Sequence, residues 1–104
     1  MYDLAPVRLS SRSTYLKFTD AKEHALSPVR HVEGVMTPLI LAHGDAETPE
    51  FQRQSRDFAA ALRIAGKPAE LIVAEGYNHF ELFETMASPY GVVGRARLQQ
   101  MGLI

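Results

Sequence analysis

One spacing constrains the fold of this chain more than any other: two apolar runs, each followed by a polar loop, separated by one helix. The first run, Pro38–His43, leads into the carboxylate-bearing loop Gly44–Glu50. The second run, Glu70–Ala74, leads into Glu75–Glu81, which contains a histidine. Neither run alternates apolar and polar residues, which is typical of strands buried on both faces of a parallel sheet. The spacing predicts a strand, a helix and a second strand.

The intervening helix has a predicted beginning and end. Thr48 stands where an N-cap belongs, and Pro49 suits the first helical position. Gly66 fits the carboxyl end and Pro68 prevents continuation. The side chains expected on one apolar face are Phe51, Phe58, Leu62 and Ala65. We therefore predict an α/β fold whose βαβ unit has parallel strands at about 38–43 and 69–74, joined by a right-handed crossover with flanking helices.

The flanking segments carry weaker patterns. Residues Ser10–Thr14 indicate a polar loop or a short irregular helix. Asp20 is expected to cap a helix that ends near Leu26, because Ser27 precedes a proline. Residues Pro28–Thr37 are expected to form a connector, and Val92–Met101 a final helix. A short helix is predicted over His79–Met86.

Composition excludes several classes of function. The 104 residues are enough for one compact domain, and 46% hydrophobic with 22% charged residues is typical of a globular protein. A net charge of −1, with mixed signs, favours neither nucleic acid nor membrane as a partner. Without cysteine there are no disulfides or thiolate metal sites. No secretory signal or membrane-spanning run is evident, so a cytoplasmic location is expected.

His79 is the leading candidate for chemistry. Histidine is the side chain that titrates near neutrality, and a loop beyond a parallel strand's carboxyl end is where ligands meet α/β sheets. The alternative is a loop histidine that only bonds backbone groups. His24, His31 and His43 are weaker candidates. Phe80 is expected to pack in the core rather than to line a pocket.

The acid that would orient His79 is Glu47, with Asp45 as the alternative. Such an acid must lie far enough beyond the strand to turn back toward the imidazole. Glu47 lies just before the helix, whereas Asp45 directly follows Gly44 and is expected to stabilise the turn. No group of residues has the spacing of metal ligands or of a phosphate loop, so neither a metal nor a cofactor is expected.

Two segments resemble a known family. Glu47-Thr-Pro-Glu-Phe-Gln-Arg-Gln54 and Tyr77-Asn-His-Phe-Glu81 look like the arylformamidase (kynurenine formamidase) branch of the α/β-hydrolases, with its esterase–lipase relatives. Tyr2-Asp-Leu-Ala-Pro6 and Leu26-Ser-Pro28 also look like segments of this family. The resemblance implies that Glu47 is the triad acid and His79 the triad histidine of a hydrolase acting on aryl formamides or carboxylic esters. In that fold the triad runs nucleophile, acid, histidine along the chain.

The nucleophile of such a triad is missing from the sequence pattern. There is no Gly-x-Ser-x-Gly elbow and no His-Gly-Gly loop, and none of the serines has a strand–turn–helix setting. We therefore expect residues 1–104 to form one partial α/β-hydrolase domain, the C-terminal half, inactive by itself. The expected partners are a small acyl substrate in the intact enzyme and either the missing N-terminal half or a second copy of the chain.

A non-catalytic role is the competing hypothesis. Two strands make a thin sheet, and the first would present an open apolar edge suited to pairing. A binding or oligomerisation module derived from a hydrolase would use that edge.

Overall fold

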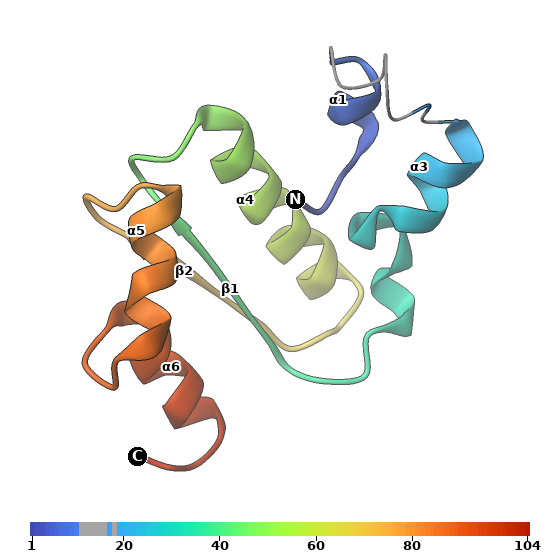
Figure 1. The fold of residues 1–104 in the computed structure, drawn as a ribbon. Coiled ribbons are helices and arrows are strands. Elements are labelled where there is room, and N and C mark those ends of the chain that lie inside the picture. Colours follow the sequence, from blue (N-terminus) through green and yellow to red (C-terminus); the bar gives the residue numbers. More distant parts are fainter. Residues whose placement is uncertain (11–16, 18) are drawn as a thin grey trace.

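The centre of the structure is the predicted strand–helix–strand unit (Figure 1). A computed structural model describes residues 1–10, 17 and 19–104. Strand β1 (Leu39–Gly44), helix α4 (Pro49–Ile64) and strand β2 (Ala69–Ala74) follow one another along the chain. The strands pair in parallel, with Leu39 opposite Ala69 and Gly44 opposite Ala74. The parallel βαβ unit is confirmed, with β1 one residue later than expected.

Helix α4 begins and ends where its sequence indicated, but the expected side-chain hydrogen bond at its N-cap is not formed. Thr48 occupies the N-cap position, yet its side chain accepts no cap hydrogen bond. At the other end Gly66 adopts a φ of +74°, a left-handed conformation that glycine adopts without a Cβ penalty. Its N–H bonds the Arg63 carbonyl, and the Lys67 N–H bonds the Leu62 carbonyl. These two bonds form a Schellman motif, which satisfies the last carbonyls of the helix.

The core lies between α4 and one face of the two strands. Leu41, Phe58, Ala59 and Leu62 are buried there, at most 5% exposed. Each buried large apolar side chain contributes roughly 1.5–3 kcal/mol relative to an exposed one. Partly buried apolar side chains from outside the unit, among them Tyr2, Val29 and Val32, cover the far side of this cluster. The amino-terminal segments therefore stabilise the position of α4 on the sheet.

The segments before β1 differ from expectation in two places. Helix α1 spans Ala5–Arg8, α3 spans Asp20–Leu26, and a 3-10 helix, η1, spans Pro28–Gly34. The N-cap of α3 is Thr19, whose side chain accepts from Lys22 N, and not Asp20 as predicted. The predicted connector is mostly this 3-10 helix. Of the segment predicted as a polar loop or irregular helix, residues 11–14 lie outside the described part of the chain.

The other face of the strands carries the carboxyl-terminal helices (Figure 1). Helix α5 spans His79–Glu84, the 3-10 turn η2 spans Thr85–Ala87, and α6 spans Val92–Gln100. Both α5 and α6 contact β1. Helix α4 thus covers one face, and α5 with α6 covers the other, which is the layering of an α/β fold.

One edge of β1 lacks a strand partner within the described residues, since the sheet is β1–β2 alone. The N–H groups of Leu39 and Asp45 bond the carbonyls of Pro68 and Ala74 on the β2 side. Backbone groups alternate along a parallel strand, so those of Ile40 and Ala42 face the other edge. This edge is available for pairing.

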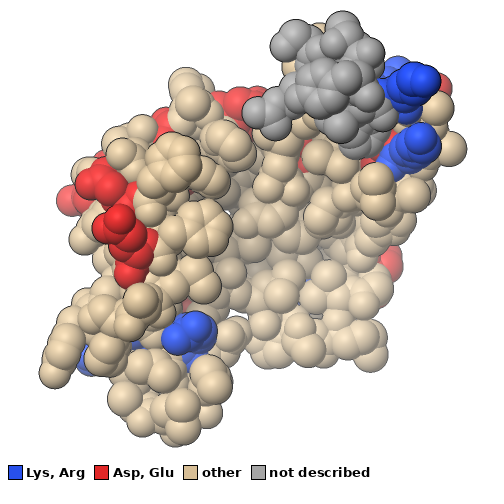
Figure 2. Space-filling model, in the orientation of Figure 1, with Lys and Arg blue, Asp and Glu red and all other residues tan. Residues whose placement is uncertain are grey.

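Charge is spread thinly over the face drawn in Figure 2. Acidic side chains lie mainly over the start of α4 and over α5, with smaller acidic areas beside α3 and η1. Basic side chains lie over α3 and α6, and a wide uncharged surface lies between the charged areas. This pattern agrees with a net charge of −1 and shows no large patch of one sign on that face. Among the described helices none is both long and apolar enough to cross a membrane.

Candidate active site

Glu47 and His79 meet at the carboxyl ends of the two strands. Glu47 lies three residues beyond β1, in the loop to α4, and His79 is the first residue of α5. His79 Nδ1 is 2.6 Å from Glu47 Oε1. The structure therefore brings together the two residues favoured by the sequence. That they act in catalysis stays a prediction.

Both oxygens of the Glu47 carboxylate are held. While Oε1 faces the imidazole, Oε2 accepts the backbone N–H of Gly44 at 2.6 Å. The Glu47 side chain is 4% exposed, whereas the His79 side chain is 44% exposed. A carboxylate only accepts hydrogen bonds, so Nδ1 of a neutral His79 carries the hydrogen and Nε2 is left with its lone pair. Among the described residues Nε2 has no hydrogen-bond partner. An oriented imidazole with an unoccupied Nε2 is the arrangement of a general base.

Gly44 lets the two loops approach each other. A Cβ at this position would lie 1.9 Å from the Tyr77 carbonyl oxygen. The same oxygen accepts the N–H of Ala46 at 3.1 Å. Close backbone approach of this kind needs a residue without a side chain. The segment Gly44-Asp45-Ala46-Glu47 therefore contributes the close approach of the two loops as well as the Glu47 carboxylate.

Asp45, the alternative acid, has a different partner. Its Oδ1 accepts the N–H of Gly76 at 2.6 Å, and its own N–H bonds the Ala74 carbonyl at 3.1 Å. Asp45 thus ties the β1–α4 loop to the β2–α5 loop. In the structure it is Glu47, and not Asp45, that is hydrogen-bonded to His79.

The first turn of α5 is stabilised by a capping box. The Asn78 side chain accepts the N–H groups of Phe80 and Glu81, and the Glu81 side chain accepts the Asn78 N–H. Two otherwise unsatisfied donors at the helix start are satisfied in this way. Glu81 therefore helps to hold His79 at the helix start.

Three phenyl rings surround the imidazole. Phe51 stacks on it, with ring centroids 4.9 Å apart and planes inclined by 19°. Phe80 and Phe83 approach edge-on at 5.7 Å. Phe80 is 78% exposed, so its expected packing in the core is wrong. Phe80 follows His79 by one residue, about 100° around α5, so the turn that directs His79 toward Glu47 leaves Phe80 facing outward.

Two pockets open on the imidazole. One, of about 230 Å³, is mostly apolar; it is lined by Met1, Tyr2, Ala42, Glu47, His79, Leu82, Phe83, Met86 and Val93. The other, of about 600 Å³, lies over the two loops; it is lined by Ala46, Glu47, Thr48, Phe51, Asn78, His79 and Phe80. The pocket of about 230 Å³ has room for a small apolar group next to His79, and the pocket of about 600 Å³ has room for a larger group.

Tyr2 reaches this site from the far end of the sequence. Its ring stacks on Phe58 at 4.6 Å, and its N–H bonds the buried Gln54 amide oxygen at 2.8 Å. Burial raises the pKa of the Tyr2 phenol, and repulsion from Glu47 adds to this, while a hydrogen bond with Ser55 opposes it. The only sequence signal for Tyr2 was the family resemblance, because nothing local links it to Glu47.

No second reactive centre is found in the described part of the chain. His24 and His31 are exposed and contact each other edge-on, and His43 is buried at 2% exposure. The serine hydroxyls there have other partners: Ser10 with Val7 O, Ser27 with Glu23, Ser55 with Tyr2, and Ser88 with Tyr90 N. Ser11 and Ser13 lie outside the described residues. No group of three metal-ligating side chains occurs among residues 1–10, 17 and 19–104.

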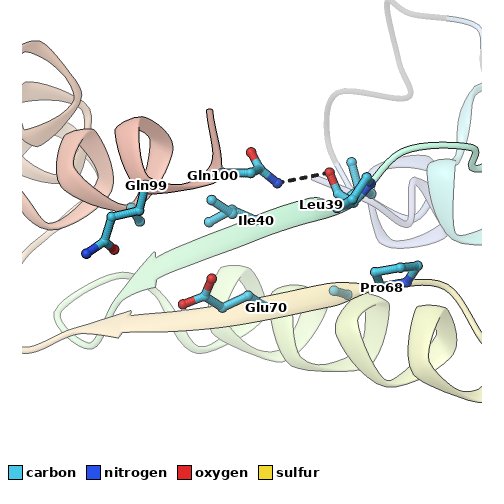
Figure 3. A pocket seen from close by; sticks show the side chains of 9 residues that line it. Leu39, Ile40, Pro68, Glu70, Gln99 and Gln100 are labelled. Carbon is cyan, nitrogen blue, oxygen red and sulfur yellow. Dashed lines mark hydrogen bonds between the residues drawn. The ribbon is translucent and has the colours of Figure 1, made fainter. Parts of the chain in front are cut away.

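A further pocket, of about 350 Å³, lies at the opposite end of the strands (Figure 3). Gln100 Nε2 donates to the Pro38 carbonyl across its rim. Glu70 is its only ionisable lining residue. Its lining contains neither a histidine nor a serine, so this pocket is not the candidate active site.

Comparison with known proteins places the fold. No protein-family model and no curated protein sequence matches the chain. Its structure is similar to that of a thermophilic esterase from Thermogutta terrifontis, solved with propionate bound. The TM-score is 0.66 and the sequence identity 21%, and the match covers 100% of this chain and 40% of the esterase chain. For esterase 2 of the same organism phosphoramylated by tabun, the TM-score is 0.61 with 23% identity over 93% of this chain and 38% of the esterase. Both structures are of esterase 2 (Est2); the chain spans about two fifths of its length, and the fold of the chain corresponds to part of the esterase fold.

Proposed function

We propose that this chain carries the acid and the base of an acyl-transfer site in a serine hydrolase of the α/β-hydrolase type. The observation that supports this most is the 2.6 Å contact between His79 Nδ1 and a buried Glu47 carboxylate at the carboxyl ends of parallel strands. The similarity of fold to an esterase agrees with it.

The proposed reaction has two halves. A serine hydroxyl from outside the described residues attacks the acyl carbonyl while His79 Nε2 takes its proton. Glu47 stabilises the imidazolium that forms. His79 then gives the proton to the leaving group, and an acyl-enzyme remains. Water, activated by the same Nε2, attacks the acyl-enzyme and releases the acid and the free serine. No cofactor is required.

The proposed substrates are small carboxylic esters or aryl formamides. The apolar pocket of about 230 Å³ beside His79 suits a short acyl or alkyl group. The more open pocket bordered by Phe51 and Phe80 suits an aromatic leaving group. The resemblance of the Glu47–Gln54 and Tyr77–Glu81 segments to arylformamidases is the reason to include formamides.

The purified chain is expected to hydrolyse neither p-nitrophenyl acetate nor N-formylkynurenine above background. A base without a nucleophile and an oxyanion hole loses most of the catalysis. Turnover by the chain that disappears in His79→Gln would contradict this part of the proposal, because it would mean that one of its own serines reacts.

A graft tests the role of the pair directly. The matching two fifths of the Thermogutta terrifontis esterase are replaced by this chain, and the folded product is assayed with p-nitrophenyl acetate. We expect turnover that falls by about 10³- to 10⁴-fold in Glu47→Gln and in His79→Gln. Glu84→Gln, an exposed carboxylate on the same helix as His79, is the matched control and should retain full activity.

The outcome is decided by the comparison between these variants. A folded graft that turns over equally well with and without His79 would exclude the proposed role. Circular dichroism and thermal melting of each variant establish that it is folded before it is assayed.

A second candidate function rests on the unpaired edge of β1. The backbone groups of Ile40 and Ala42 that face away from β2 are suited to adding a strand from another chain. In this case the chain would act as a binding or oligomerisation module derived from a hydrolase. Sedimentation tests this second function. We expect a concentration-dependent dimer that is lost in Ala42→Pro, because proline removes the N–H at the edge of β1. A monomer at all concentrations would exclude this function.

A further inference from the structure

We propose that Phe51 is a positioning residue that holds the plane of the His79 imidazole. The inference deepens the proposed function and rests on it, since it concerns the same histidine. It starts from the stacked contact between the two rings, at 4.9 Å and 19°.

The hydrogen bond to Glu47 holds only one atom of the imidazole. A ring attached at Cβ and bonded through Nδ1 can still tilt, and a tilt displaces Nε2, the atom that would exchange protons with a serine. A displacement of about 1 Å at a reacting atom can cost roughly 10²-fold in rate. A second contact, on the face of the ring, removes this freedom.

Phe51 can supply that contact because it belongs to another element. Phe80 and Phe83 lie on α5 with His79 and are 78% and 62% exposed, so they move with the helix that carries the imidazole. Phe51 lies in the first turn of α4, which is packed against both strands. The stack therefore holds the imidazole in a fixed orientation relative to the core.

The helix period explains the arrangement. Phe51 and Phe58 are seven residues apart, two helical turns, and so lie on nearly the same face of α4. Phe58 is 5% exposed in the core, while Phe51 reaches the imidazole at the carboxyl ends of the strands. One face of one helix thus contacts both the core and the candidate site.

The experiment measures the imidazole itself and needs no catalytic activity. In the ¹⁵N-labelled chain, the Nδ1–H proton of His79 is identified by its absence in His79→Gln, and its exchange with water is measured. We expect Phe51→Leu to accelerate this exchange by about 2- to 12-fold, the factor that corresponds to one aromatic pair contact. Phe51→Tyr, which retains the ring, should exchange like the unmodified chain.

The matched control is Phe58→Leu, the same change on the same helix at a ring that stacks on Tyr2. It should lower the melting temperature more than Phe51→Leu and leave the exchange within 2-fold. Equal acceleration in both leucine variants, or none in Phe51→Leu, would overturn the inference.

Glu47→Ala, which removes both carboxylate oxygens and with them the acceptor of the Nδ1–H, separates this inference from the proposed function. If it accelerates exchange while Phe51→Leu does not, the acid–base pair stands and only the role of Phe51 is refuted. If it leaves the exchange unchanged, the pair itself is refuted, and the role of Phe51 with it.

Discussion

Gly44→Ala should separate the two loops that form the candidate site. The added Cβ would lie 1.9 Å from the Tyr77 carbonyl oxygen and 2.7 Å from its carbon. Real Cβ atoms essentially never come closer than 3.0 Å to another heavy atom, so the carbonyl must move by about 1.1 Å. Both groups in this clash are backbone, so no side-chain rotation relieves it.

The cost follows from what that displacement breaks. Overpacking against a fixed neighbour costs about 1–3 kcal/mol, and losing the Ala46 N–H bond to the Tyr77 carbonyl costs about 1 kcal/mol more. We expect the free energy of unfolding to fall by about 2–4 kcal/mol. His79 follows Tyr77 by two residues, so its 2.6 Å bond to Glu47 should lengthen beyond hydrogen-bond distance.

Urea denaturation measures the first effect and exchange of the His79 Nδ1–H proton the second. Gly34→Ala is the matched control, because a Cβ there meets nothing within 4 Å, and it should change stability by less than about 0.5 kcal/mol. A Gly44→Ala chain as stable as the Gly34→Ala chain, with a protected imidazole proton, would refute the reasoning.

Three further predictions concern polar groups near the site. Asp45→Ala removes the acceptor of the Gly76 N–H and should destabilise the fold by about 1–2 kcal/mol in urea denaturation. The hydrogen bond between His79 and Glu47 should survive, and its loss would show that Asp45 also holds His79. His43→Leu should raise the free energy of unfolding by about 1–2 kcal/mol, because the buried Nε2 has no partner among the described residues; a loss of stability would show that this nitrogen is satisfied. Hydrogen bonds, first of all from Arg53, hold the pKa of Glu50 at about 2, below the usual 4.5. The folded state therefore gains stability above pH 4.5 that is lost as the pH falls toward 2, and Glu50→Gln should flatten this part of the stability curve; an unchanged acid limb would contradict it.

The elements around the site could be read from the sequence because their signals are local. Two apolar runs without alternation predicted β1 and β2, and a proline at one end with a glycine and a second proline at the other bounded α4. Such signals depend on residues within a few positions of one another. The N-cap of α3 shows the limit of this accuracy: Thr19 and Asp20 both suit the position, and the backbone direction at that turn selected Thr19.

The sequence alone determined that a carboxylate loop and a histidine loop would leave the same end of the sheet, because the two strands of a βαβ unit run parallel. The sequence left Glu47 and Asp45 as alternative partners of His79, since both lie on the carboxylate loop within reach of the histidine loop. Tertiary structure decided between them: with Gly44 beside Ala74 in register, the Asp45 carboxylate meets the Gly76 N–H and the Glu47 carboxylate meets the imidazole. The contacts of Phe51 and Tyr2 with this site were also decided only by tertiary structure. A helical pattern indicates which face is apolar, whereas the partner of that face depends on segments that are distant in the chain.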